Sequence, residues 1–162
     1  MSTMPSPYHF TDPFAKAVLE TASSADTSFA YKIPGIGMSQ ERQAIWIEQK
    51  LKDAFMIRNP KGQTLLYCLL RFTINNYVRE IILYSASVEQ LATKNTNCGS
   101  TALMGFVYGE YENPRMTKDY KMRKIIDNAN INKPGVADIL SIPNNLSENC
   151  FTFYIPITRW QH

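Results

Sequence analysis

The chain has 162 residues, of which 44% are hydrophobic and 19% are charged, and this composition is that of a folded globular protein and not of a disordered chain. Its formal net charge of +3 permits weak attraction to nucleic acid but does not require it. The length predicts a single domain over residues 1–162, with residues 1–10 as an N-terminal arm.

The first predicted elements are two helices separated by a short strand. The segment "TDPFAKAVLETASS" predicts a helix with Asp12 as N-cap and Pro13 at its first position. Alternating apolar residues predict an edge strand over 27–33. The segment "SQERQAIWIEQKLKDAFM" predicts an amphipathic helix. We expect its core face to consist of Ile45, Ile47, Leu51, Ala54 and Phe55. A turn follows at 58–62, where Pro60 and Gly62 disfavour helix.

The most apolar part of the sequence predicts one long helix over 63–84, hydrophobic on two sides and therefore central. Charged residues at its centre make a membrane span unfavourable, so we expect a core helix. Ser87 can cap a further helical segment. Because Gly105 and Gly109 lower helix propensity and Phe106 to Tyr108 favour β structure, a strand is predicted over 101–108.

The C-terminal part predicts a helix over about 117–128, one helical turn at 135–140 and a strand over 150–158. Together these elements predict an α+β fold that is mainly α-helical, with about four helices around the central helix 63–84 and two or three short strands. We find no internal sequence repeat.

A stripe of polar residues on the predicted central helix is the first candidate site. Arg71, Asn75 and Arg79 are spaced four residues apart and would share one face of the helix. Two arginines on a buried helix need acceptors. They either pair with carboxylates of a neighbouring helix or bind an anion, a phosphate or another subunit.

A basic segment, "NPRMTKDYKMRKIID", is the second candidate site for nucleic acid or another anion. Its basic residues are Arg115, Lys118, Lys121, Arg123 and Lys124. Asp127 can pair within the helix, and a nucleic-acid site normally presents a broader basic surface. We therefore expect an ordinary solvated helix face, with nucleic-acid binding as the alternative.

Catalytic and metal-binding patterns are weak. The two histidines, His9 and His162, lie near the chain ends, so we expect no histidine-based catalytic site, no metal site and no cofactor. Glu110 and Glu112 would share a face of the predicted strand, which leaves a small carboxylate-dependent enzyme as a distant alternative. Cys68, Cys98 and Cys150 are too widely spaced for a disulfide framework or a zinc site.

The leading functional hypothesis is a non-enzymatic structural or interaction protein. It would act through contacts with copies of itself or with other proteins in an assembly. The first alternative is a nucleic-acid-binding, coat-like assembly protein that uses Arg71, Arg79 and the basic segment 115–124. Free thiols and an N-terminus without the pattern of a secretory signal predict a cytoplasmic protein that does not associate with membranes.

Overall fold

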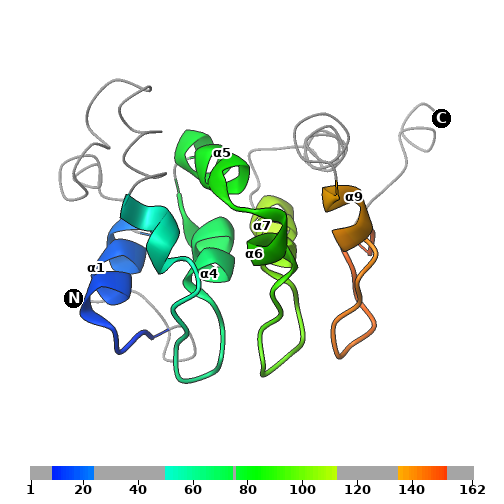
Figure 1. The fold of residues 1–162 in the computed structure, drawn as a ribbon, viewed down its shortest axis with the longest axis horizontal. Coiled ribbons are helices and arrows are strands. Elements are labelled where there is room, and N and C mark those ends of the chain that lie inside the picture. The colour runs from blue at the N-terminus through cyan, green and yellow to red at the C-terminus, as the bar shows by residue number, and fades with distance from the viewer. Residues whose placement is uncertain (1–8, 24–49, 75, 113–134, 153–162) are drawn as a thin grey trace.

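A computed structural model describes residues 9–23, 50–74, 76–112 and 135–152 of the chain. Within these ranges it contains six α-helices and one short 3-10 helix (Figure 1). In chain order they are α1 (Pro13–Ala22), η3 (Lys52–Ala54), α4 (Leu65–Phe72), α5 (Asn76–Ser85), α6 (Val88–Ala92), α7 (Ala102–Glu112) and α9 (Val136–Ile139). Helix α4 is central, because it packs against α1, α5 and α7.

The fold is mostly helical, and the α+β prediction is not confirmed. The described ranges contain no β-strand, only two isolated antiparallel bridges, Arg58 with Thr64 and Lys94 with Thr101. The strand predicted at 101–108 is wrong, since these residues lie mainly in α7. The predicted strand 27–33 lies outside the described residues, and of 150–158 only a turn at 150–152 is described.

Helix α7 forms despite its two glycines because they fit it against α4. A Cβ atom on Gly105 would lie 2.4 Å from the carbonyl oxygen of Tyr67, and one on Gly109 would lie 2.7 Å from that of Arg71. The two glycines, four residues apart, therefore form one strip on which the backbone of α4 rests. Close packing of the helices outweighs the low helix propensity of glycine.

The predicted single helix 63–84 is also wrong, because the chain ends α4 at Phe72 and starts α5 at Asn76. Thr73 closes α4 in an extended conformation. The N–H of Ile74 then donates to the carbonyl of Ala22 at the end of α1 (2.9 Å) instead of continuing the helix. This long-range hydrogen bond redirects the chain, so that α5 starts as a separate helix.

Two predicted helix caps are confirmed. The side chain of Asp12 accepts a hydrogen bond from Ala15 N–H, with Pro13 at the first position of α1. Ser87 caps α6 through a capping box with Gln90. The second predicted helix, with Ile45 and Ile47, lies outside the described residues up to position 49, and its described end contains only η3. Leu51, Ala54 and Phe55 are buried, as expected for its core face. The predicted helix 117–128 lies outside the described part.

Three loops share one pattern of backbone hydrogen bonds, a structural repeat that inspection of the sequence missed. Each loop begins at an asparagine, and the asparagine carbonyl accepts an N–H from a residue with positive φ further along. The pairs are Asn59 with Gly62, Asn95 with Gly99, and Asn144 with Ser147. In each loop the N–H of the asparagine also donates to the carbonyl of the residue after the positive-φ position.

The turn is part of a larger repeated unit. A short helix precedes each loop: η3 before the first, α6 before the second and α9 before the third. Thr64 and Thr101 end the first two loops, and their hydroxyl oxygens accept hydrogen bonds from Tyr67 N–H and Met104 N–H in the first turn of α4 and α7. Figure 1 shows the three loops side by side along one edge, below the row of α1, α4 and α7.

Backbone hydrogen bonds join neighbouring loops in a constant register. The N–H of Thr96 donates to the carbonyl of Gly62 (3.1 Å), and the N–H of Asn145 donates to that of Cys98 (2.8 Å). Thr96 and Asn145 each follow the asparagine of their loop. Both acceptors lie three residues after the asparagine of their own loop. Successive loops are therefore joined in the same order, as in a repeat protein.

Candidate functional site

The two arginines of the predicted stripe lie on different helices and have different environments. Arg79, on α5, is buried, and its side chain is only 3% exposed. Its Nε donates to the carbonyl oxygen of Leu70 (2.8 Å) and its Nη2 to that of Phe106 (3.1 Å). In a continuous helix the N–H of Ile74 would donate to the Leu70 carbonyl, but here it donates to the carbonyl of Ala22. Arg79 therefore caps the C-terminus of α4 and ties it to α7.

A buried ion pair completes the Arg79 environment. Arg79 Nη1 lies 3.4 Å from Glu110 Oε1 of α7, and both side chains are 3% exposed. The guanidinium also lies over the ring of Phe106, 4.6 Å from its centroid. Burial lowers the pKa of Arg79, and the Glu110 carboxylate opposes this shift. These contacts correspond to the structural one of the two predicted roles.

Arg71, on α4, forms a second and more accessible pair. Its Nη2 donates to Glu112 Oε2 (3.0 Å), and its Nη1 donates to the hydroxyl of Tyr67 (2.9 Å). The guanidinium lies 4.9 Å from the ring centroid of Tyr108. With side-chain exposures of 19% for Arg71 and 50% for Glu112, this pair is at the surface.

Glu110 and Glu112 do not converge on one site. Because α7 is a helix, residues two apart point to different sides, and the two carboxylates bind different arginines. The predicted strand would have placed both carboxylates on one face, and in the helix they do not share a face. Asn75 and the basic residues of the second candidate site lie outside the described part of the chain. The latter are Arg115, Lys118, Lys121, Arg123 and Lys124.

The edge formed by the three loops is a surface that inspection of the sequence did not identify. We define the loop edge as residues 58–64, 94–101 and 143–148. Its basic side chains, Arg58, Lys61 and Lys94, are exposed. Leu146 at the tip of the third loop is 76% exposed. The asparagine and glycine spacing of the first two loops is the signal that would have indicated this repeated edge.

Basic side chains link successive loops at equivalent positions. Arg58 precedes the asparagine of the first loop, and its Nη1 donates to the carbonyl of Lys94 (3.1 Å). Lys94 precedes the asparagine of the second loop, and its Nζ donates to the carbonyl of Pro143 (3.3 Å). Pro143 precedes the asparagine of the third loop. The edge is therefore held together by side chains as well as by the backbone.

The third loop is joined to α7 through a polar network. Asn144 Nδ2 donates to the hydroxyl oxygens of Ser100 (3.1 Å) and Tyr108 (3.2 Å) and to Glu148 Oε1 (3.1 Å). The Tyr108 hydroxyl donates to the same Glu148 oxygen (2.8 Å). Burial, followed by the hydrogen bond to Glu148, raises the pKa of Tyr108 to about 12, so the hydroxyl keeps its proton, and this hydrogen bond, to a higher pH than an ordinary tyrosine would. The network fixes the position of the third loop.

The three thiols are free and differ in access, which gives a testable prediction. Cys68 and Cys150 are buried, and burial raises the pKa of each thiol to about 12. Cys98, in the second loop, is partly exposed. Because the thiolate is the reactive form, alkylation of the native protein at pH 8 is expected to modify Cys98 first. Mass spectrometry of tryptic peptides over time measures this order, and equal rates at all three cysteines would contradict the structure.

Among residues 9–23, 50–74, 76–112 and 135–152, no three His, Cys, Asp or Glu side chains are grouped in a way that could hold a metal ion. No helix in these same ranges has the length and hydropathy needed to cross a bilayer. Comparisons of the chain with protein-family models, with curated proteins and with solved structures give no match.

Proposed function

We propose that the chain is a helical-repeat protein that acts through protein–protein contacts and not as an enzyme, with the loop edge as its contact surface. The observation that carries this proposal is the constant register of the three loops, each preceded by a short helix. Stacked repeats of this kind present extended surfaces, and repeat proteins use such surfaces for binding.

The order of elements supports a particular type of repeat. Ankyrin-type repeats consist of a β-turn followed by two helices, with a threonine at the start of the first helix and a leucine two residues later. Here a turn leads into α4, which α5 follows, and a second turn leads into α7. Thr64 with Leu66 and Thr101 with Leu103 have the expected spacing. The resemblance to ankyrin-type repeats consists of this order of elements and this spacing of threonine and leucine.

The polar contacts within the fold favour a binding function over catalysis. Arg71, Arg79, Glu110 and Glu112, the charged residues first considered for a site, stabilise contacts of α7 with α4 and α5. Nucleic-acid binding, the alternative, loses support because its two arginines are engaged by glutamates. The partners proposed are therefore copies of the same chain or other proteins, within the cytoplasm.

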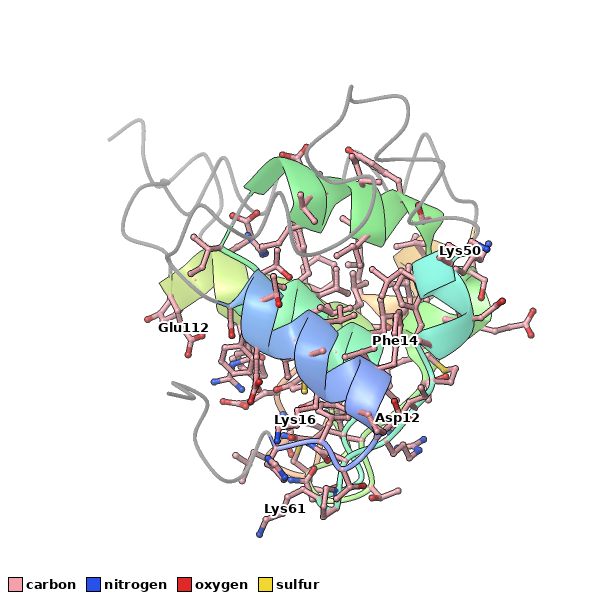
Figure 2. The ribbon with its side chains drawn as sticks, turned by 90° about the vertical axis from the view of Figure 1, so that its left-hand side faces the viewer. Asp12, Phe14, Lys16, Lys50, Lys61 and Glu112 are labelled. Carbon is pink, nitrogen blue, oxygen red and sulfur yellow. The ribbon has the colours of Figure 1, made fainter. Side chains whose placement is uncertain are left out.

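Photo-crosslinking tests the proposal directly. A photoreactive amino acid at Asn97, exposed in the second loop, is expected to crosslink to protein, either a second copy or a component of a cell extract. The same group at the exposed Lys50 is the control, because Figure 2 shows Lys50 far from the loop end where Lys61 lies. Gels and mass spectrometry identify the products.

Two results would contradict the proposal. One is the absence of any crosslink specific to Asn97, together with light scattering that shows a monomer of 18.5 kDa at high concentration. The other is a native complex whose ratio of absorbance at the nucleic-acid and protein maxima indicates bound nucleic acid, which would favour the alternative function.

A further inference from the structure

We propose that the loop edge binds an extended acidic segment of a partner protein, in which a hydrophobic residue follows the acidic ones. This inference rests on the proposed function, because it specifies the chemistry of the partner at the same surface. It is carried by the distribution of charge and apolar exposure over the three loops.

The first two loops have charge of one sign only. Residues 58–64 and 94–101 contain three basic side chains, Arg58, Lys61 and Lys94, and no aspartate or glutamate. All three are exposed, and among the described residues none of them pairs with a carboxylate. Because the two loops are hydrogen-bonded to each other, the three positive charges gather along one short stretch of edge.

Two of the three basic groups are held in place before any partner arrives. Arg58 donates to the carbonyls of Gly62 and Lys94, and Lys94 donates to the carbonyl of Pro143. Carbonyl oxygens orient these cations without neutralising them. A partner carboxylate would therefore meet positioned donors, and less side-chain entropy is lost on binding than with free side chains.

The third loop changes the character of the edge from basic to apolar. Leu146 is the most exposed large hydrophobic residue of the described chain, at 76%. Its backbone N–H is bonded to Asn144 Oδ1 (2.8 Å), and the next residue, Ser147, has a φ of 61°. A non-glycine residue with positive φ is strained. The turn therefore holds Leu146 outward, next to the basic stretch, where an apolar side chain of the partner can cover it.

A protein segment fits this edge better than nucleic acid does. Nucleic-acid affinity comes from many phosphate contacts along a broad basic surface. Here the basic stretch spans two loops and ends at a loop that presents Leu146 and contains Glu148. An acidic segment with an adjacent hydrophobic residue matches both parts, since carboxylates pair with the cations and an apolar side chain contacts Leu146.

Fluorescence anisotropy with the full chain tests the inference. The probe is a labelled peptide of about twelve residues, enough to extend over roughly 40 Å, with alternating Glu and Ser followed by two Leu. A second peptide replaces Glu by Gln, and a third replaces the two Leu by Ser. We expect saturable binding of the first peptide that weakens with added salt, because exposed charges are screened. The Gln peptide is expected not to bind.

Variants locate the binding surface. K61E alone is expected to lower affinity for the Glu peptide a few-fold, and K61E/K94E about ten-fold, because each exposed ion pair contributes modestly. The matched control, K50E, makes the same charge change at an exposed residue that Figure 2 shows far from Lys61, and it is expected to leave affinity unchanged. L146S is expected to weaken the peptide with Leu about ten-fold and to leave the peptide without Leu unchanged. Thermal melts of each variant establish that it is folded.

The outcomes distinguish this inference from the proposed function. If the Glu peptide does not bind, or if K50E weakens it as much as K61E does, the acidic-partner inference is overturned. The proposed function still stands in that case if Asn97 crosslinks to protein. If a single-stranded oligonucleotide of equal charge binds more tightly than the peptide and responds to K61E/K94E, the edge is a nucleic-acid surface and both proposals fail.

Discussion

Replacing Arg79 with glutamine is expected to lower the free energy of unfolding by about 3–5 kcal/mol, the usual effect of removing one partner from a buried ion pair. The substitution takes the guanidinium away from the Glu110 carboxylate, which is 3% exposed, and from the carbonyls of Leu70 and Phe106. Chemical denaturation monitored by circular dichroism measures the change.

The matched substitution is R71Q on α4. Arg71 pairs with Glu112 at the surface, so we expect a loss of less than about 1 kcal/mol. The double variant R79Q/E110Q is expected to recover part of the stability that R79Q loses, because no uncompensated carboxylate stays buried. If R79Q and R71Q were equally mild, Arg79 would not have the structural role assigned to it.

The second large effect is expected at Gly105, where alanine should lower the free energy of unfolding by about 2–3 kcal/mol. The added Cβ would lie 2.4 Å from the carbonyl oxygen of Tyr67, which belongs to the backbone of α4 and cannot rotate away. The helices must separate, and the packing of Phe106 and Leu103 loosens with them. A thermal melt is expected to show a midpoint lower by about 4–12 °C.

Helix propensity alone predicts that G105A would raise the free energy of unfolding instead of lowering it. Glycine to alanine within a helix normally stabilises by about 1 kcal/mol. The control is A17G at an exposed position of α1, for which only propensity matters and a loss of about 1 kcal/mol is expected. A G105A variant more stable than the parent would show that α7 does not approach α4 as closely as described.

The starts of α1 and α6 could be predicted from the sequence because they depend on neighbouring residues. Asp12 with Pro13 and Ser87 with Gln90 satisfy the N–H groups of the first helical turn within a few positions. The same is true of the turn at 58–62 and of the buried face that includes Leu51 and Phe55. Each of these features depends on residues that are only a few positions apart in the sequence.

The break between α4 and α5 could not be read from periodicity. The apolar pattern continues through 63–84, but the chain turns because Ile74 N–H bonds to Ala22, some fifty residues earlier in the sequence. Arg79 then occupies the Leu70 carbonyl that a continuous helix would have used. Hydrogen bonds between segments distant in the sequence accompany the break between α4 and α5. As a consequence, Arg71 and Arg79 lie on different helices and contact different neighbours.

The repeat escaped detection because its three copies conserve geometry more than residue type. The second loop has one more residue than the other two between its asparagine and the positive-φ position. That position is Gly62, then Gly99, but Ser147 in the third loop. The first two loops share asparagine, glycine and threonine positions in the sequence, but only the backbone bonds show that the third loop is equivalent to them. The full loop edge could therefore not be predicted from the sequence.

The middle loop is bonded on both sides, to the first through Thr96 and to the third through Asn145. In a linear array of this kind, the stability of each loop depends partly on its interfaces with the neighbouring loops. Opening the middle loop breaks two interfaces, whereas opening the first or the third breaks one interface of this kind within the described ranges. A partner that held only the first two loops would therefore also restrain the third loop, which carries Leu146, through the bond between Cys98 and Asn145.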